Sequence, residues 1–247
     1  VYGWIRHGRE SIHRPRAIGK AAGPSMWTEV FSCYTRLMNP KSADPANPLA
    51  TIEIGSTGIR ILIASIGKDG TIKVLDRAGK PSRIGRDVFT QGIISREAIR
   101  ESIAVLATFR ELLAAYGISP EETKVIGTSA LREAGNKETF VDRITLQTGF
   151  KTRIIEDIEE NHLMYLAVQQ ALMDERKLLG KTNAMILEVG GGTTEIMLLR
   201  RGRMVSSHSL HIGTLRLDEQ MREAGASKDY LEEYLAKIGR ASCRERV

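Results

Sequence analysis

Two short turns of the sequence carry residue types that can hold phosphate. Gly55, Ser56 and Thr57 lie between two β-branched runs, and GGGTT, which begins at Gly190, lies between two more. Turns of glycine and small hydroxyl residues expose backbone N–H groups and hydroxyls with little side-chain bulk, which suits close approach to phosphate oxygens. One such turn is weak evidence, because small residues also favour hairpins for steric reasons. Two related turns predict a site that binds successive phosphates of a polyphosphate chain.

An acidic residue lies near the end of the strand before each turn. Glu53 and Glu188 stand 135 residues apart, in the similar segments TIEIGSTGIRILI and ILEVGGGTTEIML. Carboxylate oxygens hold hard cations such as Mg²⁺, directly or through water. No GxxxxGK[ST] pattern is present, so the phosphate grip must be of the hairpin type. The repeat predicts a duplicated α/β architecture whose two turns and two carboxylates face one cleft.

The elements that must position these residues alternate between strand and helix. TIEIG, IRILIASIG and TIKVLDRAG predict a first meander of three strands, and AMILEVGG, TTEIMLLRRG and MVSSHSL predict a second. TKVIGT and RIIE read as short strands between helices. The sequence therefore predicts an α/β fold in which each glycine turn joins the first two strands of a meander.

Capping residues and apolar spacing predict the helices. Ser95 caps a long helix that ends at Gly117, and Asn136 caps the next helix. A further helix is predicted from Glu159 to about residue 175, and a short one follows Gly213.

Composition limits the class of protein. Hydrophobic residues make up 42% of the 247 residues and charged residues 27%, which excludes general disorder. No run reaches the roughly 18 apolar residues of a membrane span, so no membrane partner is expected. The net charge of +6 comes from the two ends, because residues 49–237 hold equal numbers of acidic and basic side chains. Both cysteines, Cys33 and Cys243, also lie at the ends, so the centre has no thiolate metal site.

The two ends differ from the centre in pattern. Residues 1–48 show no periodicity and are expected to be an irregular leader outside the fold, with Met26 or Met38 as the natural start. A basic arm that binds nucleic acid often carries interleaved aromatic residues in helical phase, and residues 1–48 lack this pattern. No nucleic-acid partner is therefore expected. Residues 238–247, IGRASCRERV, resemble a translated sequencing adapter. The fold is expected to comprise a first lobe, 49–177, and the start of a second, 178–237.

Six segments occur in the order typical of one known family. They are IEIGSTGIR, SRIG with Gly92, TSALREAGN, IEDIEENHLMYLAV, LEVGGGTTE and GTLRL. From about Ala50 to Lys237 the chain resembles the exopolyphosphatase and guanosine pentaphosphate phosphohydrolase family, within the acetate and sugar kinase, heat-shock chaperone and actin superfamily. The resemblance implies a duplicated, actin-like (ribonuclease H-like) α/β fold of two lobes with an interdomain cleft, the second lobe truncated.

The resemblance also implies roles for individual residues. The first phosphate loop would be Gly55, Ser56 and Thr57, and the second would be Gly190, Gly191, Gly192, Thr193 and Thr194. Arg132 matches an arginine that contacts phosphate, which a guanidinium fork suits. A metal ion, Mg²⁺ or Mn²⁺, would be held by Glu53, Glu188 and Glu195.

The base that activates the attacking water would be one residue of an acidic pair. Glu159 and Glu160 both match the family's glutamate, but consecutive helical residues point about 100° apart, so only one can face the cleft. We expect Glu159 to be the base, with Glu160 as the second choice. Nearby negative charge would raise the pKa of this carboxylate and improve it as a proton acceptor.

The implied function is that of a cytoplasmic enzyme of the stringent response. It would release terminal phosphate from inorganic polyphosphate or guanosine pentaphosphate with Mg²⁺ and a glutamate-activated water, and its full-length form could be a homodimer. The family usually has Asp where Glu53 and Glu188 stand, which keeps open a sensor that binds polyphosphate or the alarmone without hydrolysis. A third reading, an ATP-dependent kinase, would need an adenosine pocket and an acceptor site.

Overall fold

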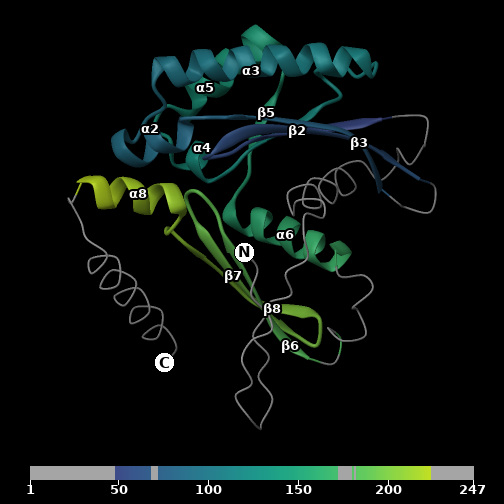
Figure 1. Ribbon diagram of the computed structural model, residues 1–247, viewed down its shortest axis with the longest axis vertical. Coiled ribbons are helices and arrows are strands. Elements are labelled where there is room, and N and C mark those ends of the chain that lie inside the picture. Colours follow the sequence, from purple (N-terminus) through teal and green to yellow (C-terminus); the bar gives the residue numbers. More distant parts are fainter. Residues whose placement is uncertain (1–47, 68–71, 172–179, 181, 224–247) are drawn as a thin grey trace.

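The computed structural model describes residues 48–67, 72–171, 180 and 182–223, which form two β-sheets and their helices (Figure 1). A five-stranded mixed sheet has the order β3-β2-β1-β4-β5, and a three-stranded antiparallel sheet has the order β6-β7-β8. Nearly all of the expected leader, 1–48, and all of the expected tail, 238–247, lie outside the described residues. Among the described helices, none is long and apolar enough to cross a membrane.

The first sheet has its buried core around β1. Its strands are β1 (Leu49–Ile54), β2 (Gly58–Ile66), β3 (Ile72–Pro81), β4 (Lys124–Gly127) and β5 (Thr152–Ile154). The first three run antiparallel, which confirms the first predicted meander, and β4 and β5 are added in parallel. Because β1 is paired on both sides and covered on both faces, its apolar residues Ile52 and Ile54 are fully buried.

Four helices accompany this sheet: α2 (Ile84–Gln91), α3 (Arg96–Ala115), α4 (Ser129–Glu133) and α5 (Lys137–Thr148). Ser95 caps α3 as predicted, since its hydroxyl accepts a hydrogen bond from the Ala98 N–H at 3.1 Å. In Figure 1, α3 and α5 lie side by side over one face of the sheet, where Leu106 and Phe140 are fully buried. The sequence pattern does not predict α2 and α4, because helices of so few turns carry too short an apolar repeat.

The second sheet follows a long helix, α6 (Asp157–Ala171), which begins two residues before the predicted start. Its strands are β6 (Asn183–Val189), β7 (Thr194–Arg200) and β8 (Arg203–Leu210), and the predicted short helix is α8 (Thr214–Glu223). The pairing of β6 with β7 and of β7 with β8 confirms the second predicted meander. Each meander carries its glycine turn between its first two strands, so this part of the repeat is observed, while the two duplicated lobes, the second of them truncated, stay a prediction.

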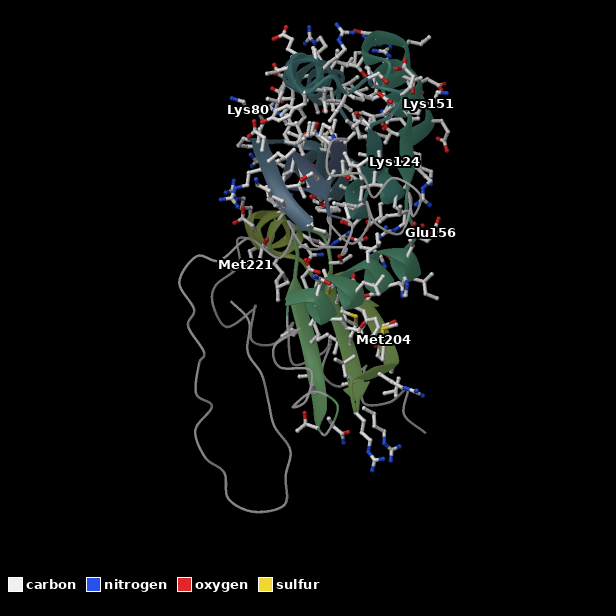
Figure 2. All side chains as sticks on the ribbon, turned by 90° about the vertical axis from the view of Figure 1, so that its right-hand side faces the viewer. Lys80, Lys124, Lys151, Glu156, Met204 and Met221 are labelled. Carbon is white, nitrogen blue, oxygen red and sulfur yellow. The ribbon has the colours of Figure 1, made fainter. Side chains whose placement is uncertain are left out.

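Helix α6 joins the two sheets. Leu163 and Ala167 pack in one cluster with Ile126 and Ile155 of the first half of the molecule, by which we mean the five-stranded sheet and helices α2 to α5. Met164 and Val168, on a neighbouring face of α6, pack in another cluster with residues of the second sheet. Figure 2 shows this arrangement from the side, with Met204 of β8 beside α6. The rotation of α6 about its axis is therefore fixed by two apolar contacts at once.

Asn136 precedes α5 as predicted, but its side chain does not cap that helix. Its Oδ1 accepts a hydrogen bond from the Ile94 N–H at 2.9 Å, and its Nδ2 donates one to the Ile94 carbonyl, also at 2.9 Å. The side chain thus ties the segment before α3 to the start of α5, a contact between residues far apart in the sequence.

We expect Asn136→Ala to lower the free energy of unfolding by about 1–3 kcal/mol, because it leaves both backbone groups of Ile94 without their partner. Urea unfolding followed by circular dichroism measures the change. Asn183→Ala, at an exposed position of β6, is the matched control and should leave stability nearly unchanged. Equal midpoints for the two variants would show that the hydrogen bonds between Asn136 and Ile94 contribute nothing to stability.

Candidate functional site

The two glycine turns meet face to face. The Gly55 N–H donates to the Gly58 carbonyl at 3.0 Å, and the Gly190 N–H donates to the Thr193 carbonyl at 2.9 Å, so both turns are closed by the same kind of hydrogen bond. A Cβ atom added to Gly191 would stand 2.7 Å from the methyl carbon of Thr57. The prediction that the two turns face one another is therefore confirmed, and their close approach leaves little room for a side chain at position 191.

A small cavity of about 40 Å³ lies where the turns meet. Its wall combines four carboxylates, five hydroxyl side chains, two glycines and one arginine. The lining residues are Glu53, Ser56, Thr57, Arg60, Thr128, Ser129, Glu160, Glu188, Gly190, Gly191, Thr193 and Glu195. The wall is thus rich in groups that bind phosphate oxygens or cations.

Parallel pairing of β1 with β4 brings the segment TSALR to the first turn. Because the two strands point the same way, both end at one edge of the sheet, where the Thr128 N–H donates to the Ile54 carbonyl at 3.3 Å. The hydroxyls of Ser56 and Ser129 are hydrogen-bonded at 2.9 Å and buried. Sequence reasoning assigned no role to Thr128 and Ser129, although both stand in a segment that resembles the family.

The second turn is held from behind by the first turn of α8. The Thr214 N–H donates to the Gly190 carbonyl at 2.9 Å, and the Leu215 N–H donates to the Gly191 carbonyl at 3.0 Å. The first N–H groups of a helix have no partner within it, so the turn and the helix satisfy one another. A Cβ at Gly213 would stand 2.3 Å from the Gly191 carbonyl, so this contact also requires glycine.

Glu53 and Arg60 form a partly buried ion pair at the side of the first turn. Glu53 is 1% exposed, and its Oε2 lies 3.1 Å from Arg60 Nη1. Arg60 also donates to the Thr57 hydroxyl at 3.0 Å. Burial raises the pKa of Glu53 to about 7, although the positive charge of Arg60 acts in the opposite direction. Arg60 is a cation of the cavity wall that sequence reasoning did not single out, despite its place in IEIGSTGIR.

Glu188 and Glu195 are direct cross-strand partners in β6 and β7. Directly opposed residues project from the same face of a sheet, so both carboxylates enter the cavity and repel one another. Burial raises the pKa of Glu188 to about 8, and the negative charges of Glu160, Glu53 and Glu195 add to the rise. Burial also raises the pKa of Glu195, whose Oε1 accepts a hydrogen bond from the Ser209 hydroxyl at 2.6 Å.

Glu160, and not Glu159, faces the cavity. The Glu159 carboxylate pairs with the half-exposed Arg153, with 2.8 Å from Arg153 Nη1 to Glu159 Oε2, and does not line the cavity. The expectation that Glu159 occupies the cleft is therefore wrong. The reason is the rotation of α6, which is set by its apolar contacts with both sheets and turns Glu160 inward.

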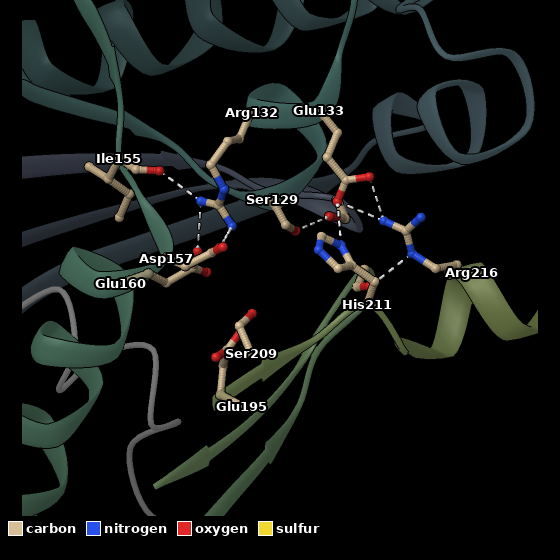
Figure 3. Close-up of polar contacts among 12 residues, drawn as sticks. Ser129, Arg132, Glu133, Ile155, Asp157, Glu160, Glu195, Ser209, His211 and Arg216 are labelled. Atoms are coloured by element: carbon tan, nitrogen blue, oxygen red, sulfur yellow. Dashed lines mark hydrogen bonds and ion pairs between the residues drawn. The ribbon is translucent and has the colours of Figure 1, made fainter. Parts of the chain in front are cut away.

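Arg132 does not line the cavity either, but holds Glu160 (Figure 3). Its Nη1 donates to Glu160 Oε2 at 3.1 Å and to the Ile155 carbonyl at 2.7 Å, and its Nη2 is paired with Asp157. The expected contact of Arg132 with phosphate has no support in this arrangement, because nearby acceptors engage its guanidinium. Burial raises the pKa of Glu160 to about 7 against the opposing effect of Arg132.

Three other predicted residues support the turns from outside the cavity wall. Gly55 and Gly192 are close-packed, since an added Cβ would stand 2.8 Å from Glu53 Oε1 and 2.5 Å from Phe89 Cζ, respectively. The Thr194 hydroxyl donates to the Ile212 carbonyl. Of the residues predicted to bind phosphate, five therefore line the cavity: Ser56, Thr57, Gly190, Gly191 and Thr193.

Comparison with known proteins supports the family resemblance of the six sequence segments. Residues 62–238 match the sequence model of the Ppx/GppA phosphatase family. Exopolyphosphatase 2 of Mycobacterium tuberculosis is 29% identical over 182 residues, which cover 70% of this chain and 54% of that protein. A bifunctional 3-dehydroquinate synthase/phosphatase of Fusobacterium nucleatum is 27% identical over 188 residues, 74% of this chain and 28% of that protein. The chain thus spans about half, or less, of the length of these curated relatives.

A solved structure shows a similar fold. The Ppx/GppA phosphatase of Aquifex aeolicus, in its type II variant, is 28% identical and gives a TM-score of 0.56 over 78% of this chain and 64% of that chain.

The raised pKa values predict a stability that falls as pH rises. Unfolded glutamates ionise near pH 4.5, whereas Glu53, Glu160 and Glu188 keep their protons in the folded state up to about pH 7 to 8. The folded state therefore binds more protons between these values, and the free energy of unfolding should decrease from pH 5 to pH 9. Glu188→Gln removes the ionisable group, so it should raise the free energy of unfolding at pH 9 by on the order of 1 kcal/mol. At pH 5 the free energy of unfolding should change little.

Urea unfolding at the two pH values measures this difference. Glu159→Gln, at a glutamate outside the cavity, is the control and should leave the pH dependence as it is in the wild type. A Glu188→Gln variant that is destabilised equally at both pH values would contradict the account.

Proposed function

Because the chain belongs to the Ppx/GppA phosphatase family, we propose that it is a phosphohydrolase that releases terminal phosphate from inorganic polyphosphate. Guanosine pentaphosphate, which presents the same terminal phosphate, is the second substrate that we propose. The observation that carries the proposal is the cavity between the two glycine turns, with Glu160 in its wall. The exopolyphosphatase named among the relatives supports polyphosphate as the substrate class.

The charge of the cavity requires compensation before a polyanion can enter. Four glutamates line it, and Arg60 is the one cation among its described lining residues. Ionised carboxylates in the cavity wall would repel the negatively charged phosphate oxygens of a bound polyanion. Protons on the glutamates or a bound divalent cation would remove this repulsion.

The donor set fits a hard cation such as Mg²⁺ or Mn²⁺. The carboxylates of Glu53, Glu188 and Glu195 would hold it, and Glu195 Oε2 is buried without a hydrogen-bond partner among the described residues. No three acidic, His or Cys side chains of the described segments are already gathered in a metal-binding geometry, so the carboxylates would have to move inward. When bound, the cation would neutralise charge on the phosphate oxygens.

The residues of the chain divide the remaining work between binding and proton transfer. The hydroxyls of Ser56, Thr57 and Thr193 and the backbone of the second turn would donate hydrogen bonds to phosphate oxygens. Glu160, held by Arg132, would accept a proton from the attacking water. As the water oxygen bonds to the terminal phosphorus, the bond from that phosphorus to the bridging oxygen breaks. The polyphosphate then leaves with one phosphate fewer. A pKa of about 7 suits a base that must accept a proton near neutral pH.

We expect Glu160→Gln to lower the rate of phosphate release from polyphosphate by roughly 100- to 10,000-fold, because the amide keeps the size of the side chain but cannot accept the proton. Glu159→Gln is the matched control on the neighbouring residue and should stay within a few-fold of the wild type. Released phosphate is measured colorimetrically with Mg²⁺ or Mn²⁺ present, and binding of inorganic triphosphate is measured by calorimetry.

A loss in Glu159→Gln with full activity in Glu160→Gln would contradict the assignment of the base. A wild-type protein that binds inorganic triphosphate tightly, but releases phosphate from neither substrate, would be a sensor rather than a hydrolase.

Magnesium should raise the melting temperature, and more so at pH 8.5 than at pH 6. At the higher pH the glutamates of the cavity are ionised and repel one another, so a cation relieves more unfavourable charge. Thermal unfolding of wild type and Glu188→Gln, with Mg²⁺ or with EDTA, measures the effect, which should be smaller in the variant. An identical shift in both proteins would exclude Glu188 from the metal site.

A further inference from the structure

Arg216 of α8 connects the second glycine turn to the first half of the molecule. Its Nε donates to the Gly192 carbonyl at 3.1 Å, and its Nη2 donates to both carboxylate oxygens of Glu133, at 2.6 and 2.7 Å. Its guanidinium carbon lies 4.2 Å from the ring centroid of Phe89 in α2. Figure 3 shows Arg216 and Glu133 on the opposite side of Ser129 from Arg132. One side chain thus contacts α2, α4 and the second turn.

The contact with Gly192 fixes the direction of a peptide group in the cavity wall. In a trans peptide the carbonyl of one residue and the N–H of the next point in opposite directions. The Gly192 carbonyl is directed at Arg216, so the Thr193 N–H is directed away from it, and Thr193 lines the cavity. The Gly190 carbonyl is held by Thr214 in the same way, which orients the N–H of Gly191. Successive N–H groups with one orientation form an anion-binding concavity.

The turn is confined on its other side as well. A Cβ at Gly192 would stand 2.5 Å from Phe89 Cζ and 3.0 Å from the Ser129 hydroxyl, so the turn rests directly on α2 and α4. Arg216 stacks on the same Phe89 ring and is 17% exposed at its side chain. Because Gly192 and Glu133 engage its Nε and Nη2, and Arg216 does not line the cavity, Arg216 serves the backbone of the turn rather than the phosphate itself.

We propose that Arg216 is a positioning residue for phosphate binding, which locks the Gly192–Thr193 peptide so that its N–H faces the cavity. The inference rests on the proposed function, since it concerns the same cavity. Without the guanidinium fork, this glycine peptide can rotate and present its carbonyl oxygen to the phosphate, which is repulsive.

The chain offers a matched control in a second ion pair of α8. Arg86 Nε of α2 lies 2.9 Å from Glu219 Oε1 of α8, so this pair also joins the two halves of the molecule. Neither residue lines the cavity, and no hydrogen bond or ion pair of the described structure joins either of them to a glycine turn. Arg86→Met and Arg216→Met therefore each remove one positive charge and one ion pair between the halves, but only the second variant releases the turn.

Binding of inorganic triphosphate, measured by calorimetry with Mg²⁺, tests the proposal together with the rate of phosphate release. We expect Arg216→Met to raise Kd by about 10- to 100-fold and to lower kcat/KM to match, while Arg86→Met stays within about twofold of the wild type. Arg216→Lys keeps the charge but cannot fork onto Gly192 and Glu133, so it should be nearly as impaired as Arg216→Met. Arg216→Lys also carries the test if the methionine variant does not fold.

Equal losses in Arg216→Met and Arg86→Met would reduce Arg216 to a contact between the halves and overturn the proposal. Wild-type affinity in Arg216→Lys would also overturn it, because charge alone would then suffice. A wild-type protein that neither binds triphosphate nor releases phosphate would instead refute the proposed function, which is a distinct result.

Discussion

Four glutamates share one cavity, and the unfavourable free energy of their ionised state governs the rest of the site. Burial raises the pKa of Glu53 and Glu160 to about 7 and that of Glu188 to about 8. The fold compensates two of them locally, since Arg60 pairs with Glu53 and Arg132 with Glu160. The cross-strand pair of Glu188 and Glu195 has no arginine of this kind among the described contacts, and it is the place where a cation would relieve the most repulsion.

The walls around these charges are held mainly by backbone contacts. Parallel pairing of β1 with β4 sets the first turn beside Ser129, and the N-terminal N–H groups of α8 bind the carbonyls of the second turn. Close approach explains the glycines, because a Cβ at Gly191 or Gly213 would collide with the opposite turn or with the turn's own backbone. A site built in this way positions N–H groups and hydroxyls without relying on long flexible side chains.

The arginines of the site act on protein groups in this structure. Arg132 orients Glu160, Arg60 contacts Glu53 and Thr57, and Arg216 donates hydrogen bonds to the Gly192 carbonyl and to Glu133. Guanidinium groups suit this task, because their planar donors can hold a carboxylate and a second acceptor at once. The positive charge close to the cavity is thus largely used to organise the protein, so the proposed function would leave contact with the phosphate to backbone N–H groups, hydroxyls and a cation.

The sequence by itself determined the two meanders, the two glycine turns at their first hairpins and the acidic residues before them, because strand alternation and glycine-rich turns are local properties of the chain. It did not determine which of Glu159 and Glu160 faces the cavity. That choice depends on the rotation of α6, which Leu163 and Met164 fix by packing against different sheets. Nor could it show that Arg132 binds Asp157 and Glu160, or that Asn136 binds Ile94, since these partners are brought together only by tertiary packing. Local patterns specify the elements, whereas the facing of a side chain and its partner depend on contacts between elements.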